Sequence, residues 1–234
     1  MTLAQALERC ERQIEAGGHA QQVSINAAKI VALRDDPRLR MVVDRAALVN
    51  ADGVSVVWAS RALGDPLPER VTGINLMYEL IALAERRNWS VYLLGARREM
   101  LERAVARLRM RHPGLTIAGY RDGYFDDAAS AVLCADVRAT APDVVFVAMG
   151  SPRTERWLGE HGHALGAALT MGVGGAVDVL AGKARRAPAA FQRLGLEWLY
   201  RLAQEPRRLL GRNLKSVTFW RMVAGELIAR RRSR

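Results

Sequence analysis

Polar residues that end short apolar runs are the first candidates for chemistry in this sequence. Asp52 lies between a run that ends at Asn50 and a glycine, Gly53, and Asn26 ends an earlier run. A carboxylate in such a place can act as a general base that takes a proton from a substrate hydroxyl. Asp is also a favoured N-cap residue, so the structural alternative is that Asp52 caps a following helix.

A glycine-rich turn is the second candidate. Gly172, Gly174 and Gly175 follow an apolar run and precede a helical pattern that contains Asp178. Glycines let the backbone approach a ligand closely, and a helix N-terminus presents free N–H groups to a phosphate. The turn lacks the full G-x-G-x-x-G spacing of a dinucleotide-binding loop. A phosphate site and a plain tight turn are therefore both open.

Basic residues gather in the last part of the chain. Residues 183–234 contain 14 basic and 3 acidic residues, whereas the first 182 contain 21 of each, so this segment carries the whole +11 net charge. This distribution argues against a uniformly basic nucleic-acid binder and indicates a neutral unit whose basic segment contacts an anionic partner. Arginines suit diphosphates because their planar fork binds in a bidentate way. A solvated helix face is the alternative.

Residues 209–231 combine this charge with a helical apolar pattern. Apolar side chains recur at helical spacing at Leu209, Leu210, Leu214, Val217, Trp220, Ala224, Leu227 and Ile228. A basic amphipathic helix with a tryptophan is typical of binding to an anionic membrane surface. Packing against the protein's own core or against a partner subunit is the alternative.

Other kinds of site have little support in the sequence. Cys10 and Cys134 are far apart, and the four histidines form no ligand set, so we expect no disulfide, no metal site and no cofactor. No serine lies in a G-x-S-x-G motif. The charged N-terminus is not a signal peptide, and no apolar run approaches the ~20 residues of a membrane span. We therefore expect a cytosolic protein without a transmembrane helix.

The candidate residues need a framework that brings them together. Strands are predicted at 23–26, 47–50, 89–94, 115–120, 144–149 and 168–172, with helices at 3–15, 27–34, 75–87, 99–111, 128–139, 154–160 and from the glycine turn to 181. Residues 35–46 and 54–62 are assigned to no element. The alternation predicts βαβ units, and the uninterrupted apolar run at 144–149 is typical of a strand covered on both faces.

We therefore expect an α/β fold, with a Rossmann-like, mainly parallel sheet, helices on both faces and a helical C-terminal appendage. The predicted boundary separates residues 1–182 from residues 183–234. Ligands of open α/β sheets bind outside the carboxyl ends of the strands. Asn26, Asn50, Asp52, Gly150 and the glycine turn all occupy such positions in this prediction.

Two functions of other classes fit parts of this pattern. An NAD-dependent Rossmann oxidoreductase would bind its nicotinamide cofactor at the glycine turn, but the incomplete glycine fingerprint and the lack of a well-placed ribose-binding acid weaken it. A nucleic-acid-binding module would use the basic segment and show steeply salt-dependent affinity. No recognised nucleic-acid fold signature supports that second alternative.

A series of short motifs occurs in order along the chain and together resembles one family. The motifs are residues 50–53 (NADG), 69–73 (ERVTG), 94–95 (LG), 119–124 (GYRDGY), 142–143 (PD), 150–155 (GSPRTE), 172–175 (GVGG), 186–188 (RAP), 196–201 (LEWLYR) and 205–208 (EPRR). Each motif is weak alone, but the ordered series resembles the TagA/WecG/CpsF family, glycosyltransferase family 26. The resemblance covers about residues 20–215.

The resemblance implies an inverting, metal-independent transferase. Such enzymes move a sugar from a UDP-sugar donor to a polyprenyl-diphosphate-linked sugar at the cytoplasmic face of the membrane, in bacterial cell-surface polysaccharide synthesis. Family substrates include N-acetylmannosamine, its uronic acid and glucose. The resemblance further implies a peripheral protein on an anionic membrane surface, without a nucleic-acid partner and with a homo-oligomer as one open possibility. The appendage is implicated in membrane contact and in completing the active site.

The resemblance also assigns roles to individual residues. Asp52 matches the proposed general base, Asn26 and Arg70 match polar pocket residues, and Arg201 and Arg208 match appendage arginines thought to reach the diphosphate. Gly172, Gly174, Gly175 and Asp178 lie where UDP is expected, and Asn50 and Gly150 join the predicted substrate-binding set as strand-end residues.

One position departs from the family pattern. Thr154 stands in the sequence Pro152-Arg153-Thr154-Glu155, where the family has Pro-Lys-Gln-Glu. The missing glutamine is thought to line the active site. Threonine is shorter and lacks the paired donor and acceptor of an amide, so this departure concerns which hydroxyl group of the donor or acceptor is recognised.

Overall fold

The centre of the molecule is one six-stranded, all-parallel sheet. The computed structural model describes residues 1–183, 187–188, 191, 200 and 206–232. The strands are β1 (Ala20–Ile25), β2 (Leu48–Ala51), β3 (Ser90–Gly95), β4 (Thr116–Arg121), β5 (Val144–Ala148) and β6 (Leu169–Gly172). Their order in the sheet is β2-β1-β6-β5-β3-β4. The predicted Rossmann-like α/β fold is confirmed, and each strand pair is parallel.

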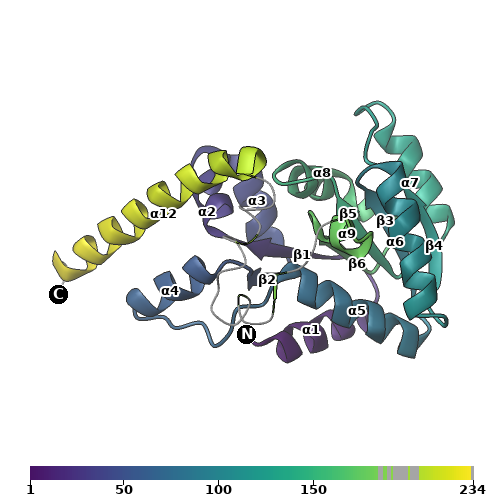
Figure 1. The fold of residues 1–234 in the computed structure, drawn as a ribbon, viewed down its shortest axis with the longest axis horizontal. Helices are drawn as coiled ribbons and strands as arrows, with labels where there is room; N and C mark the ends of the chain where they lie inside the picture. Colours follow the sequence, from purple (N-terminus) through teal and green to yellow (C-terminus); the bar gives the residue numbers. More distant parts are fainter. Residues whose placement is uncertain (184–186, 189–190, 192–199, 201–205, 233–234) are drawn as a thin grey trace.

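Helices cover both faces of this sheet (Figure 1). They are α1 (Leu3–Ala16), α2 (Ala27–Asp35), α3 (Pro37–Arg45), α4 (Val54–Ala62), α5 (Gly73–Arg87), α6 (Arg98–Arg111), α7 (Ser130–Ala139), α8 (Arg153–His161), the 3-10 turn η1 (Gly162–Leu165), α9 (Ala176–Leu180) and α12 (Pro206–Arg232). Parallel strands need such connections, because the chain must cross back to the end of the sheet where the previous strand began before the next strand can start.

The alternation of side chains in β5 shows how the two faces are filled. Val144 and Phe146 belong to a core cluster with residues of α1, α5, α6 and α9, whereas Val145 and Val147 belong to a second cluster with residues of α7 and α8. Successive residues of a strand point to opposite faces. The fully apolar sequence of β5 is therefore explained by its burial on both sides.

Two helices were absent from the sequence prediction. The first, α3, begins with Asp36 as its N-cap, whose side chain accepts from Leu39 N, and with Pro37 in the first turn. The second, α4, follows Gly53 and contains the valine-rich run Val54–Val57, which by propensity favours a strand. Packing of α4 against other helices overrides this local preference.

The C-terminal helix α12 contributes a third apolar cluster. Phe219 and Val223 are buried and pack with Ala27 and Val31 of α2 and with Ala59 of α4. The helix crosses α2 and runs outward to the C-terminus (Figure 1). Near its end, Arg230 donates to the carbonyl of Leu63, 2.7 Å away, just after α4.

Within the described residues, no helix combines the length and apolar character that a membrane span requires. The predicted division at residue 182 stays a prediction, because most of residues 184–205, the first part of the predicted appendage, lie outside the described residues.

A glycine at the end of β3 provides a test of how the strand ends are packed. Gly95 has φ +112°, and an added Cβ would lie 2.5 Å from the carbonyl carbon of Ala148 at the end of β5. We expect Gly95→Ala to lower the free energy of unfolding by about 1–3 kcal/mol more than Gly64→Ala. Gly64 also has a positive φ, +87°, but its Cβ would meet nothing within 4 Å. Urea denaturation of both variants measures the difference, and equal losses would contradict this packing.

Candidate active site

The ends of β1 and β2 bring two of the predicted residues together. The strands pair in parallel, with Ser24 opposite Asn50 and Ile25 opposite Ala51. Just beyond the last pair, the N–H of Asp52 donates to the carbonyl of Ile25 over 2.8 Å. Asn26 and Asp52 therefore leave neighbouring strands at the same edge of the sheet. The sequence predicts their places at strand ends, and the structure adds that the two strands are neighbours.

The structure excludes one of the two roles considered for Asp52, and its role as a base stays a prediction. The N-cap of α4 is Gly53, and no side chain caps this helix, so Asp52 is not its cap. Asp52 is half-buried, and its carboxylate lies at the strand end where the prediction needs a base. Asn26, by contrast, does cap a helix, because its side chain accepts from the N–H of Lys29 at 3.0 Å.

Below these strand ends lies a buried network of amides and hydroxyls. The side-chain amide of Gln22 donates to Asn50 Oδ1 and, over 3.1 Å, to Ser24 Oγ. Asn50 in turn donates through Nδ2 to the carbonyl of Val71 at 2.6 Å. Asn50 is thus a buried structural link between β2 and the segment before α5, rather than an exposed polar group. Its contact with substrate stays a prediction.

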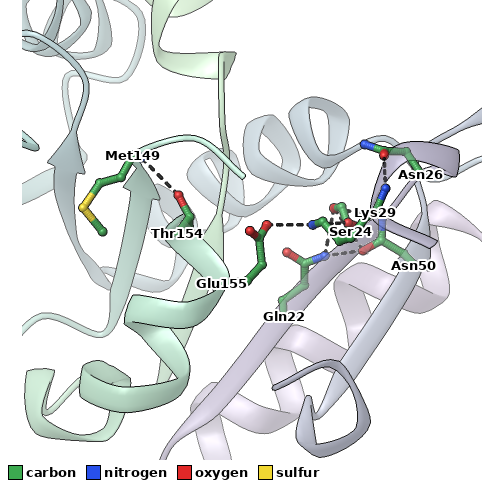
Figure 2. A network of polar contacts seen from close by, with 8 residues as sticks. All are labelled: Gln22, Ser24, Asn26, Lys29, Asn50, Met149, Thr154 and Glu155. Atoms are coloured by element: carbon green, nitrogen blue, oxygen red, sulfur yellow. Dashed lines mark hydrogen bonds and ion pairs between the residues drawn. The ribbon is translucent and has the colours of Figure 1, made fainter. Parts of the chain in front are cut away.

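An ion pair continues this network to the helix after β5. Lys29 Nζ lies 2.7 Å from Glu155 Oε1 and donates to the carbonyl of Ser24 at 2.6 Å. The two charged side chains are only 6% and 8% exposed. Figure 2 shows Glu155 of α8 reaching across to Lys29 of α2, with Gln22 and Asn50 beside them.

Thr154, the position that departs from the family pattern, is buried beside this pair. It is 2% exposed, and its hydroxyl accepts from the N–H of Met149 at 3.1 Å (Figure 2). An added Cβ at Gly172 would lie 3.0 Å from Thr154 Cγ2. Thr154 therefore packs under the end of β6, and its predicted role in substrate recognition stays a prediction.

The glycine turn after β6 has an open backbone. Gly174 is exposed with φ +51°, and an added Cβ at Gly174 or Gly175 would meet nothing within 4 Å. Gly175 is the N-cap of α9, and Asp178 lies in the first turn of that short helix. The turn lies next to β1, because β6 pairs with β1 in the sheet.

The other predicted residues are less closely tied to this centre. Arg70 is partly exposed and directly precedes Val71, to which Asn50 donates. Gly150 is exposed after β5, with φ +82°. Arg201 lies outside the described residues, and for Arg208 the structure describes only its place in the first turn of α12.

The geometry of the described residues supports neither a metal site nor a reactive thiol. Among the residues that the structure describes, no group of three His, Cys, Asp or Glu side chains could hold a metal ion. Cys10 and Cys134 are both buried and unpaired. Burial raises the pKa of the Cys10 thiol to about 12, which keeps it protonated and unreactive at neutral pH.

Comparison with known proteins identifies the family. The model of the glycosyl transferase WecG/TagA/CpsF family matches residues 1–233. The chain belongs to this family. The resemblance predicted from the ordered motifs is thereby confirmed, and the family assignment decides against the oxidoreductase and the nucleic-acid-binding module.

One characterised relative of the family is similar over much of the chain. It is an N-acetylglucosaminyldiphosphoundecaprenol N-acetyl-beta-D-mannosaminyltransferase from Bacillus spizizenii, 36% identical over 173 residues. The match covers 74% of this chain and 66% of the relative.

The sequence prediction missed the residues that hold the site together. Lys29 lies inside the apolar helical run of α2, and a lone cation in such a run is a signal that could have been followed. Its partner Glu155 is 126 residues away in the chain. Only the sheet order, which places the ends of β1 and β6 side by side and α8 nearby, brings the two together.

The hydrogen bond from Asn50 to the carbonyl of Val71 can be tested by substitution. Asn50→Asp replaces the donor to Val71 O by an oxygen, so we expect a loss of about 1–3 kcal/mol in the free energy of unfolding at pH 7. Burial disfavours the charged carboxylate, so in the folded variant it binds a proton at higher pH than in the unfolded chain. Once protonated, it can donate to Val71 again, and the deficit should shrink as the pH falls toward about 4.

Urea denaturation of this variant and of wild-type protein across pH measures the deficit. Asn88→Asp is the matched control, because Asn88 is an exposed residue that ends α5 in the left-handed region. A pH-independent deficit for Asn50→Asp, or an equal one for Asn88→Asp, would contradict the role of Asn50 as donor.

Proposed function

We propose that this protein transfers N-acetylmannosamine from a UDP-sugar to a polyprenyl-diphosphate-linked N-acetylglucosamine. The observation that carries the proposal is the place of Asp52 in a chain matched over residues 1–233 by a glycosyltransferase family. Asp52 directly follows β2 at the carboxyl edge of the sheet, next to the end of β1, and is not the N-cap of α4. The activity of the 36% identical relative, an N-acetylmannosaminyltransferase, favours N-acetylmannosamine over its uronic acid and glucose.

In the proposed reaction Asp52 acts as a general base in a single displacement. Its carboxylate takes the proton of the acceptor hydroxyl while that oxygen bonds to the anomeric carbon of the donor. The bond from this carbon to the diphosphate breaks on the opposite face, so UDP leaves and the anomeric configuration inverts. Asn26, on the neighbouring strand end, is placed to contact the sugar hydroxyls beside the attacking oxygen.

The departing diphosphate needs stabilisation of its negative charge. The exposed backbone at Gly174 and Gly175 lies next to the β1 end, and N–H groups there can donate to phosphate oxygens. Arg201 and Arg208 would supply cationic groups from the basic segment in this proposal. Charge stabilisation is thus assigned to backbone and guanidinium groups, and transfer should persist in the presence of a chelator such as EDTA.

The acceptor in this proposal is a lipid, and α12 is the segment placed to approach its membrane. The face of α12 that packs on α2 and α4 carries Phe219 and Val223. On the opposite face, Val217 and Ile228 are 60% and 54% exposed, and Trp220, 40% exposed, lies on the flank beside Phe219. Apolar side chains flanked by arginines are the pattern of a helix that lies on an anionic bilayer.

Transfer itself is tested with a panel of UDP-sugars and a synthetic polyprenyl-diphosphate N-acetylglucosamine acceptor. We expect product with UDP-N-acetylmannosamine and none with the glucose or uronic acid donors. Product formed only with another donor would correct the sugar, and no product with any donor would refute the transferase proposal for these acceptors.

The base is tested by one substitution and its matched control. Asp52→Asn removes the proton acceptor and should lower kcat about 10²–10⁴-fold. Circular dichroism and the melting temperature should stay near wild type, because Asp52 caps no helix. Asp44→Asn changes an exposed aspartate near the end of α3 and should leave kcat unchanged. Equal rates for Asp52→Asn and wild type would remove Asp52 from catalysis.

The membrane surface is tested on the outer face of α12. The double variant Val217→Ser/Ile228→Ser should reduce binding to phosphatidylglycerol vesicles about tenfold or more, since two apolar side chains no longer leave water on binding. The melting temperature should not change. Met110→Ser/Val132→Ser removes two exposed apolar side chains from α6 and α7 and is the control expected to bind normally. Co-sedimentation measures both, and equal binding would refute the assignment of this face.

A further inference from the structure

We propose that the buried Lys29–Glu155 ion pair is a positioning device that sets the geometry of the strand ends at which Asn26 and Asp52 lie. The proposal rests on the function proposed above, because it assigns these charges to the alignment of a transferase site. In this proposal neither charged side chain contacts a substrate. Lys29 and Glu155 act through the backbone and side chains that they hold.

The contacts of Lys29 connect three elements at one point. From α2, its ammonium group donates to the carbonyl of Ser24 in β1 at 2.6 Å and to Glu155 of α8 at 2.7 Å. The Ser24 hydroxyl continues the connection, because Asn50 Nδ2 in β2 lies 3.3 Å from it. An ammonium group with two buried oxygen partners fixes where α8 lies relative to the end of β1 (Figure 2).

Four of the candidate side chains lie within two residues of a member of this network. The pairs are Asn26 with Ser24, Asp52 with Asn50, Arg70 with Val71, and Thr154 with Glu155. A displacement of the network therefore moves the backbone that carries the proposed base and pocket residues. Asn26 is tied twice, because it also caps the helix that contains Lys29.

Stability alone does not explain this ion pair. Taking two charges out of water is costly, and well-packed apolar residues often serve a protein core as well or better. The pair is also incompletely satisfied, since Glu155 Oε2 and the nearby network atom Gln22 Oε1 are buried without a hydrogen-bond partner. What apolar residues cannot do is hold the Ser24 carbonyl and α8 at fixed distances. The geometry is therefore the property that the charges supply.

The decisive experiment compares stability with rate in two variants. Lys29→Met/Glu155→Leu removes both charges and keeps the volume, so we expect its melting temperature to match or exceed that of either single variant. Its kcat should still fall about 10²-fold, because small misplacements of a catalytic group cost this much. The KM for the donor should change far less, since the glycine turn carries no member of the pair.

Glu155→Gln should show the opposite combination. It keeps an oxygen that can accept from Lys29 but leaves the buried ammonium without a counter-charge, so it should lower the melting temperature and retain most of the kcat. A less stable variant that is also the faster one cannot arise from a merely structural role. Arg98→Met/Glu102→Leu, an exposed pair on α6, is the control expected to change neither quantity.

Hydrogen exchange of the free protein separates this inference from the proposed function. In the double variant we expect faster amide exchange at residues 48–53 and 68–73, with α1 and α6 unaffected. If wild-type protein transfers no sugar, the proposed function fails while this readout still reports on the positioning role. A double variant with wild-type kcat and exchange would overturn the inference. If that variant does not fold, Glu155→Gln decides: kcat falling in step with stability overturns it, and kcat retained supports it.

Discussion

The charge of Lys29 is the constraint on which the candidate site depends. An ammonium group buried at 6% exposure must be compensated, and the Glu155 carboxylate and the Ser24 carbonyl are the groups that compensate it. Because these partners belong to α8 and β1, meeting the electrostatic demand also fixes how the two elements meet. The amides of Gln22 and Asn50 then extend the same requirement to β2 and to the segment before α5.

The sheet divides its strands between support and chemistry. β5 is apolar on both faces and is covered by helices on each, so it serves the core. β1 is similar in length to β5 and also lies inside the sheet, yet its buried residues include Gln22 and Ser24. Polar side chains in a buried parallel strand are costly unless they are paired. In this fold they are concentrated at the edge where the proposed substrates bind.

The sequence allowed the fold class, the approximate strand positions and the places of Asn26 and Asp52 at strand ends to be predicted, because local patterns and the geometry of parallel strands determine them. It did not reveal α4, whose valines favour a strand by propensity, whereas in the fold Val56 and Ala59 pack in the cluster that contains Phe219 of α12. The start of α3 was readable in Asp36 and Pro37, but its few buried residues leave a weak apolar pattern. The Lys29–Glu155 contact depends on strand order, which no local pattern encodes.

Helix α12 has apolar side chains on opposite faces, and only one of these faces is used inside the protein. Because Phe219 and Val223 fix the helix to α2 and α4, and Arg230 fixes its far end to the Leu63 carbonyl, the outer face has one direction relative to the sheet. A flat surface bound by that face would meet the edge that carries Asn26 and Asp52 at a constant tilt and height. An acceptor embedded in the surface would then be presented without a rotational search, unlike an acceptor reached through a freely jointed tether.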